Sequence, residues 1–262
     1  MARLRSWHLG LVALLALAVA VLAQAPPAGR DARIPPPAAG APSAMDEPLR
    51  LAHLARQSYQ QVQTYTCLLI KRERLRGQLE PDHLIRMRVR TQPFSVYLRW
   101  QGPRQFAGQE TCYVAGQNNG MMRVHGVGLA GLAGWVSLDP RDPRVLEHSR
   151  HTITEAGIGN LIERYGRRWE EERRLNQTQV RLGNFTYDNR LCRRVETIHP
   201  PGGPYAFYRS LVYFDSATHL PIRVENYDWP RPRGNPDGDL AEMYSYADLR
   251  LNVRLGEEAF NY

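Results

Sequence analysis

The sequence predicts an α+β protein: a strongly curved antiparallel sheet, open as an incomplete barrel, with two main helices on its concave side. Three observations predict it. Two segments carry apolar residues at helical spacing, and nearly all of the remaining chain alternates between polar and apolar residues. The order is helix, a run of strands, helix and another run of strands, without an internal repeat. One polar and one apolar face per strand is typical of an antiparallel sheet covered on one side.

The first 23 residues have the pattern of a signal peptide. Arg3 and Arg5 precede the uncharged apolar run 9–21, and small residues end at Ala23, where signal peptidase would cut. A run of about 13 apolar residues is too short for a permanent membrane span, which needs ~20. The residue directly after the predicted cleavage site is Gln24 and not a cysteine that could carry a lipid. We expect an exported protein of the periplasm or cell envelope, without a permanent transmembrane segment once the signal is removed.

Residues 24–44 form a predicted linker and 45–262 a single domain. The linker is rich in Pro and Ala and has almost no large apolar side chain, so it is expected to be extended. The rest is long enough to bury a sizeable core. The formal net charge of +8 is compatible with anionic partners such as lipid headgroups or acidic polymers, but a basic solvated surface is the preferred explanation. No nucleic-acid recognition motif is present, and we expect no nucleic-acid partner.

Two helices are predicted. The first begins at Asp46 as a cap, with Pro48 at a position that tolerates proline. The second begins at a capping box, Thr152 to Glu155, and its outer side is covered by charged residues. Their apolar faces consist of Leu51, Leu54, Ala55, Ser58 and Val62 in the first helix, and Ile158, Leu161, Ile162, Tyr165 and Trp169 in the second.

Period-two alternation predicts about ten strands. It is clearest over 83–90, 94–100 and 249–255, and Asp188-Asn189 marks a tight hairpin. The further predicted strands are 65–74, 110–115, 120–125, 180–187, 191–198, 205–214 and 221–227.

Two helices cannot fill the concave side of so wide a sheet, which predicts an apolar cavity between sheet and helices. Such cavities bind fatty ligands. The predicted lining consists of Ile85, Met87, Val89, Phe94, Val96, Leu98 and Trp100.

Arg86, Arg88 and Arg90 share the opposite face of one predicted strand. Like charges two residues apart repel, so the row should face water or meet acids on neighbouring strands, such as Glu73. Docking against an acidic partner or lipid headgroups is the functional alternative.

The three cysteines are an odd number in an oxidising compartment. One disulfide with one free thiol is a possible arrangement, and Cys67 with Cys192 is the preferred pair. The alternative is that Cys67, Cys112 and Cys192 are all buried small hydrophobes. Their spacing matches no zinc-ligand pattern.

Three local motifs suggest chemistry but lack the context that it requires. Residues 126–131 match the glycine pattern G-x-G-x-x-G, yet no parallel strand-helix-strand unit surrounds it, so we predict a flexible loop that could act as a lid. The alternating acids and arginines of 139–144 predict a salt-bridged surface loop. His148 and His151 lack a third ligand. We therefore expect no cofactor, no metal site and no catalytic residues.

Several separated blocks resemble an exported bacterial family, the domain of unknown function 1571. These blocks are 64–67 (TYTC), 71–74 (KRER), 93–100 (PFSVYLRW), 153–158 (ITEAGI) and 220–230 (LPIRVENYDWP). Residues 214–221 (FDSATHLP) are more distantly similar to the periplasmic lipoprotein-sorting carriers. That resemblance implies an incomplete barrel closed by helices, which binds acyl chains in its hollow. No single ligand-contacting residue is carried over.

From these observations we expect a non-enzymatic envelope protein that holds a lipid or a lipidated partner in an apolar cavity. The alternative is a scaffold module that docks an acidic polymer or protein through its arginine face.

Overall fold

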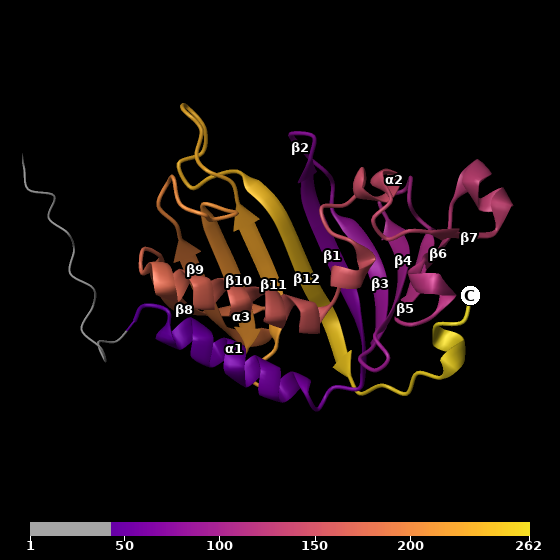
Figure 1. Ribbon diagram of the computed structural model, residues 1–262, viewed down its shortest axis with the longest axis horizontal. Helices are drawn as coiled ribbons and strands as arrows, with labels where there is room; N and C mark the ends of the chain where they lie inside the picture. Colours follow the sequence, from indigo (N-terminus) through magenta and orange to yellow (C-terminus); the bar gives the residue numbers. More distant parts are fainter. Residues whose placement is uncertain (1–42) are drawn as a thin grey trace, which may run out of the picture. The chain divides into compact units, whose positions relative to one another are not determined.

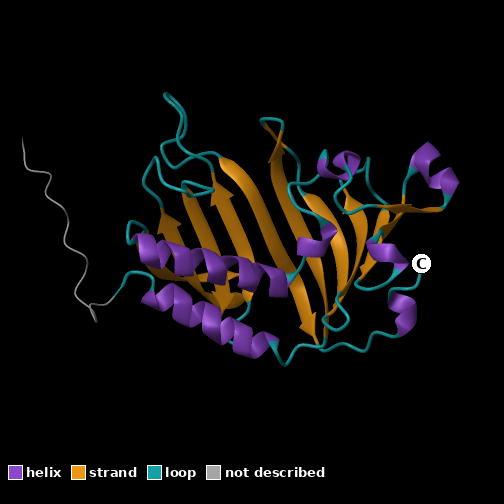
Figure 2. Cartoon of the chain, in the orientation of Figure 1, coloured by secondary structure: helices purple, strands orange, loops and turns teal. Residues whose placement is uncertain are grey.

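The computed structural model describes residues 43–262; the predicted signal peptide and the linker up to residue 42 lie outside the described residues. The body is one curved antiparallel sheet of twelve strands, and its edge strands β7 and β8 do not pair with each other. Helices α1 (Asp46–Tyr59) and α3 (Ile158–Leu175) lie on its concave side (Figures 1 and 2). The predicted α+β class and open curved sheet are confirmed.

The sheet consists of two meanders joined by the first long strand and the last. Eleven strands follow the order β7-β6-β5-β4-β3-β1-β12-β11-β10-β9-β8, and β2 pairs only with β1. Thus β1 and β12 meet at the centre of the sheet. The strands are β1 (Thr64–Leu75), β2 (Gln78–Leu79), β3 (His83–Arg90), β4 (Ser95–Gly102), β5 (Glu110–Val114), β6 (Met122–His125), β7 (Trp135–Leu138), β8 (Gln179–Tyr187), β9 (Arg190–Ile198), β10 (Arg209–Asp215), β11 (Pro221–Tyr227) and β12 (Leu240–Leu251).

The two long helices pack on each other and cover mainly the β8–β12 half of the sheet (Figure 1). Trp169 of α3 is fully buried and lies edge-on to Tyr165, with ring centroids 5.5 Å apart. Arg56 of α1 pairs with Glu163 of α3 at 2.7 Å. The β3–β7 half is covered instead by the segment 139–157, which contains the short helix α2 (Pro143–Leu146).

The second helix starts later than predicted. The capping box at Thr152 is present, but it caps a single 3-10 turn, Ile153–Glu155, and the chain then becomes extended before α3 begins at Ile158. Gly157 has a φ of 98°, and a Cβ there would lie 2.7 Å from the Tyr65 hydroxyl. That hydroxyl accepts the Ile158 N–H at 2.9 Å. A side chain of the sheet therefore caps α3, which local sequence could not indicate.

The last strand lies earlier than predicted. β12 ends at Leu251, because Asn252 adopts a φ of 53° and its side-chain oxygen accepts the Gln63 N–H. The chain then crosses the outer face, where Ala259 and Phe260 pack against Tyr97 and Cys112 in a second, smaller core. The outer face of β4 and β5 is therefore covered rather than wet. The remaining short elements are the 3-10 turns Asn118–Gly120, Gly128–Ala133 and Glu257–Ala259.

The preferred disulfide between Cys67 and Cys192 is not formed: all three cysteines are buried free thiols. Cys67 lies on β1 and Cys192 on β9, four strand positions apart in the sheet. At about 4.8 Å per strand this far exceeds the Cα separation that a disulfide bridges. Burial raises the pKa of the Cys112 thiol to about 11, and also raises the pKa of Cys67 and Cys192. The alternative interpretation, small buried hydrophobes, describes them.

Among residues 43–262, no helix combines the length and the apolar character needed to cross a membrane.

Candidate functional site: an apolar cavity with a polar end

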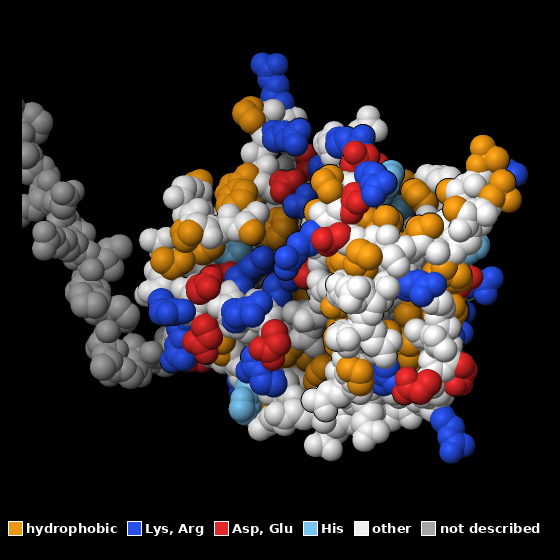
Figure 3. Space-filling view, turned by 45° about the vertical axis from the view of Figure 1, so that its right-hand side comes forward, with side chains coloured by type: hydrophobic (Ala, Val, Ile, Leu, Met, Phe, Trp, Pro, Cys, Tyr) orange, Lys and Arg blue, Asp and Glu red, His pale blue; other side chains and the backbone are white. Residues whose placement is uncertain are grey.

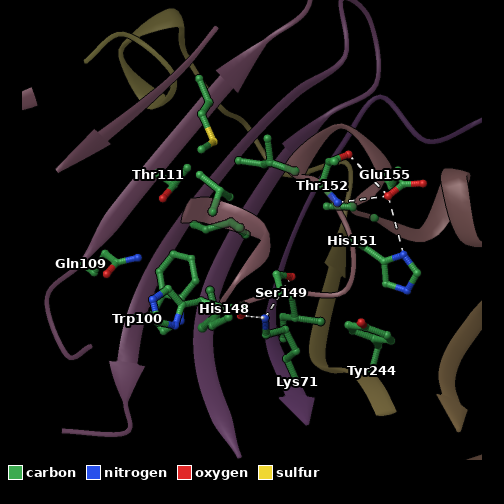
Figure 4. Close-up of a pocket in the computed structure, with 18 of the residues that line it drawn as sticks. Lys71, Trp100, Gln109, Thr111, His148, Ser149, His151, Thr152, Glu155 and Tyr244 are labelled. Atoms are coloured by element: carbon green, nitrogen blue, oxygen red, sulfur yellow. Dashed lines mark hydrogen bonds and ion pairs between the residues drawn. The ribbon is translucent and has the colours of Figure 1, made fainter. Parts of the chain in front are cut away.

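A cavity of about 320 Å³ lies on the concave side of β1, β3–β7 and β12, beneath the segment 144–157 (Figure 4). This is the part of the sheet that α1 and α3 leave uncovered. Apolar side chains from both layers make most of its wall. They are Leu69, Ile85, Leu98, Trp100, Phe106, Met122, Val124, Leu138, Val145, Ile153, Ala156 and Leu161.

Three of the seven predicted lining residues, Ile85, Leu98 and Trp100, face this cavity. Ile85 and Trp100 are cross-strand partners, and so are Val89 and Val96 farther along the same pair of strands. There the space is filled: Met87, Val89 and Val96 are buried in the main core, and Phe94 packs against that core beside Tyr113. The ligand-binding role of all seven residues remains a prediction.

One end of the cavity carries buried charges that the sequence analysis did not assign to the concave side. Lys71 Nζ donates to Glu73 Oε2 at 3.0 Å and to the Ser149 hydroxyl at 3.2 Å. The Tyr244 hydroxyl donates to the other oxygen of Glu73. A signal for this placement exists, because Lys71 and Glu73 continue the inward parity of Cys67 and Leu69 along β1.

Glu242 of β12 anchors the loop that covers the cavity. Its side chain is only 3 % exposed, and its carboxylate accepts hydrogen bonds from Arg150 Nε at 3.0 Å and from Asn226 Nδ2 at 2.8 Å. His151 Nε2 lies 2.9 Å from the same carboxylate. Burial alone would raise the pKa of Glu242, but the hydrogen bond from His151, helped by Asn226 and the charge of Arg150, holds it below its ordinary value of 4.5. The charged form is therefore the one that closes the loop onto the sheet.

We expect Glu242→Gln to lower the free energy of unfolding at pH 7 by about 1.5–3 kcal/mol, because a charged acceptor is lost. A carboxyl whose pKa is lowered by folding stabilises the native state at pH values above its unfolded pKa, and this contribution is lost as the pH falls through the folded pKa. The free energy of unfolding of the variant, measured by urea unfolding, should therefore fall less than that of the parent when the pH is lowered from 5 through the folded pKa of Glu242. Glu163→Gln, which breaks a half-exposed pair, is the control and should cost under about 1 kcal/mol. Equal losses for both variants would contradict the anchoring role.

Trp100 lines the cavity, and His83, the cross-strand partner of Lys71, holds its indole in place. Burial, followed by the charge of Lys71, lowers the pKa of His83 to about 4, so the imidazole is neutral at pH 7. Its Nδ1 accepts the Trp100 Nε1–H at 3.1 Å. This hydrogen bond holds the indole of Trp100 in the cavity wall, where it presents an apolar surface. Because His83 is neutral at pH 7, the pair adds no charge to this part of the wall.

The arginine row lies on the opposite face of β3 and meets acids other than Glu73. Arg86 pairs with Asp248 of β12 at 3.3 Å, and Arg90 pairs with Glu257. Arg88 stacks over the Tyr97 ring. The C-terminal segment thus covers part of the row, and docking through Arg86, Arg88 and Arg90 remains a prediction.

The local motifs have structural explanations. The glycine pattern 126–131 lies between antiparallel strands β6 and β7, so the parallel unit that a dinucleotide site requires is absent there. Asp142 caps α2 and pairs with Arg144 at 2.6 Å, so one pair of the predicted salt-bridged loop is present, whereas the Asp139 carboxylate accepts the Arg141 backbone N–H instead. His148 packs against the Phe106 ring, whereas His151 faces Glu242. The two histidines therefore contact different residues.

The fold and cavity define a class of single-sheet α+β proteins with a partly filled concave side. Residues 62–262 match the model of the family described as "Protein of unknown function (DUF1571)", and the chain belongs to this family. The resemblance inferred from the sequence blocks is thereby confirmed. No curated protein sequence is similar enough to this chain to count as a relative.

Several solved structures resemble the chain in fold. An uncharacterized conserved protein from Thermus thermophilus has 10 % identity and a TM-score of 0.47, over 82 % of this chain and 94 % of that one. Lipoprotein LppX from Mycobacterium tuberculosis has 12 % identity and a TM-score of 0.45, over 79 % of this chain and 97 % of that one. A LolA superfamily protein from Nitrosomonas europaea has 12 % identity and a TM-score of 0.32, over 85 % of this chain and 99 % of that one. Similarity at these levels concerns the fold alone.

Proposed function

We propose that this protein is a non-enzymatic binder of an acyl chain, carried by a lipid or a lipidated partner in the cell envelope. The observation that supports it is the cavity of about 320 Å³, walled by apolar side chains from two layers. Ligand pockets commonly measure about 300–1,000 Å³, so this one suits a single chain rather than a whole diacyl lipid.

The energetics favour such a ligand. Each buried methylene contributes about 0.8 kcal/mol, so a chain of about 16 carbons gains on the order of 10 kcal/mol before ordering costs are subtracted. The buried carboxylates near the cavity are already engaged: Glu73 by Lys71 and Tyr244, and Glu242 by Arg150 and His151. That engagement favours a structural role for these acids over acid-base chemistry.

Native mass spectrometry of the mature protein, purified from the bacterial envelope, tests the proposal, together with titration of a fluorescent fatty acid. We expect a co-purifying lipid mass and saturable binding of the probe that is insensitive to salt. A protein that carries no lipid and binds no probe would contradict the proposal. If the same preparation bound acidic polymers in a salt-sensitive way, the docking alternative through Arg86, Arg88 and Arg90 would take its place.

A further inference from the structure

The hairpin of β6 and β7 ends in an exposed apolar tip. Its short 3-10 helix, Gly128–Ala133, projects from the body at the right of Figure 1, and hydrophobic side chains gather at the same end in Figure 3. Leu129 is 88 % exposed and Leu132 84 %, the two most exposed large hydrophobic residues among residues 43–262. No charged residue occurs over 126–138.

The glycine pattern shapes this tip. A Cβ at Gly126 would lie 2.9 Å from the Ala130 Cβ, and one at Gly131 would lie 3.0 Å from the Gly126 oxygen. Gly128 and Gly134 have φ values of 60° and 66°, which side chains rarely adopt. The glycines therefore allow a compact turn in which Leu129 and Leu132 point away from the protein and are exposed to solvent.

The inner face of the hairpin connects the tip to the cavity. Val124 pairs with Val136, and Met122 pairs with Leu138, so four apolar side chains share one face of the two strands. Met122, Val124 and Leu138 line the cavity, whereas Val136 is 39 % exposed and lies on the way to the tip. An apolar track therefore runs from the exposed turn into the cavity wall.

The outer face of the hairpin carries aromatic rings next to the turn, where His125 pairs with Trp135. Trp135 lies with its ring centroid 4.9 Å from that of Tyr262 and 5.6 Å from that of His125. Tryptophan and tyrosine are enriched where proteins meet the headgroup region of a membrane. An apolar uncharged tip above aromatic residues of this kind matches the layers of a lipid bilayer with an anionic surface, because the chain keeps a net charge of +6 (32 Lys and Arg against 26 Asp and Glu) without the predicted signal peptide and its Arg3 and Arg5.

We propose that the tip of the β6–β7 hairpin docks this protein on a lipid bilayer, with Leu129 and Leu132 inserted among the acyl chains. The inner face of the hairpin then offers hydrocarbon a covered path to the cavity. This second part rests on the proposed function, whereas docking itself does not. The bilayer surface is the occupant that fits, since a narrow projecting turn offers a partner protein little area to bury.

Vesicle flotation with the mature protein tests the docking. Vesicles of phosphatidylcholine with a fraction of phosphatidylglycerol should float the parent protein. Leu129→Asp and Leu132→Asp should each lower the partition coefficient about tenfold, the order expected when one large apolar side chain no longer enters the bilayer. Leu191→Asp is the matched control, because Leu191 is 59 % exposed at the start of β9, far along the sheet from β6 and β7. It should float like the parent.

A second measurement separates this proposal from the proposed function. The Leu129→Asp, Leu132→Asp double variant should bind a fluorescent fatty acid from solution as the parent does, because neither residue lines the cavity. Equal flotation of parent, double variant and Leu191→Asp control would overturn the docking. So would a parent that does not float but forms a dimer that the double variant loses, since the tip would then be a contact between copies. A parent protein that floats with vesicles but binds no fatty acid would contradict the proposed function and leave the docking proposal standing.

Discussion

Replacing Leu98 with Trp is expected to abolish fatty-acid binding and leave the fold intact. Leu98 is 8 % exposed and faces the cavity, so the larger indole can occupy space that is empty in the structure. The ligand and the new side chain would compete for the same volume. We expect no measurable probe binding, with a free energy of unfolding within about 1 kcal/mol of the parent.

Val96→Trp on the same strand is the matched control. Val96 is fully buried in the main core and does not line the cavity, so the same enlargement must displace its neighbours. Overpacking of this kind costs about 1–3 kcal/mol or more. Urea unfolding followed by circular dichroism measures both variants. If Leu98→Trp were as destabilising as Val96→Trp, the cavity would be ordinary packed core. If it still bound the probe, the ligand site would lie elsewhere.

Phe260→Ala is expected to destabilise the protein by about 3 kcal/mol and to expose Cys112 to thiol reagents. Phe260 is buried against the outer face of the sheet, and its backbone oxygen lies 3.4 Å from the Cys112 sulfur. Arg90 also lies over its ring. Removing the ring leaves a hole in the small core that contains Cys112, and the C-terminal segment loses a buried contact with the sheet.

The thiol readout makes this test specific to the C-terminal segment. In the native protein all three cysteines are buried, so labelling with a small maleimide should be slow. In Phe260→Ala we expect modification at Cys112 alone, detected by mass spectrometry of peptides, because Cys67 and Cys192 remain in the main core. Phe185→Ala, the same truncation at a half-exposed position of β8, should cost about 1 kcal/mol and leave labelling unchanged. Labelling of Cys67 as readily as Cys112 would indicate general unfolding instead.

Part of the concave surface could be predicted from alternation alone. Ile85 and Leu98 face inward because neighbouring side chains on a strand point to opposite faces, and this holds wherever the strand lies. Lys71 and Glu73 follow the same parity, but charge obscured it, because charged residues are almost never fully buried without a partner. Their partners come from the distant residues Ser149, Arg150 and Tyr244.

The long strand β12 shows why part of the sheet was missed. Its first half lies at the centre of the sheet and is buried on both faces, so the polar–apolar alternation that predicts a half-exposed strand is weak there. Glu242 lies on the inner face and Met243 on the outer, and both are buried. The alternation instead predicts a strand over 249–255, where it is clear, but the chain turns out of the sheet at Asn252.

The sequence by itself determined the strands with a clear period of two, the two amphipathic helices and the family, because these depend on residues that are neighbours along the chain. The tertiary structure alone decided three things: which part of the concave side is filled and which is empty, which acids hold the loop over the cavity, and that the C-terminal segment covers the outer face. Each depends on contacts between residues far apart in sequence, where packing volume and charge partners are set by the fold as a whole.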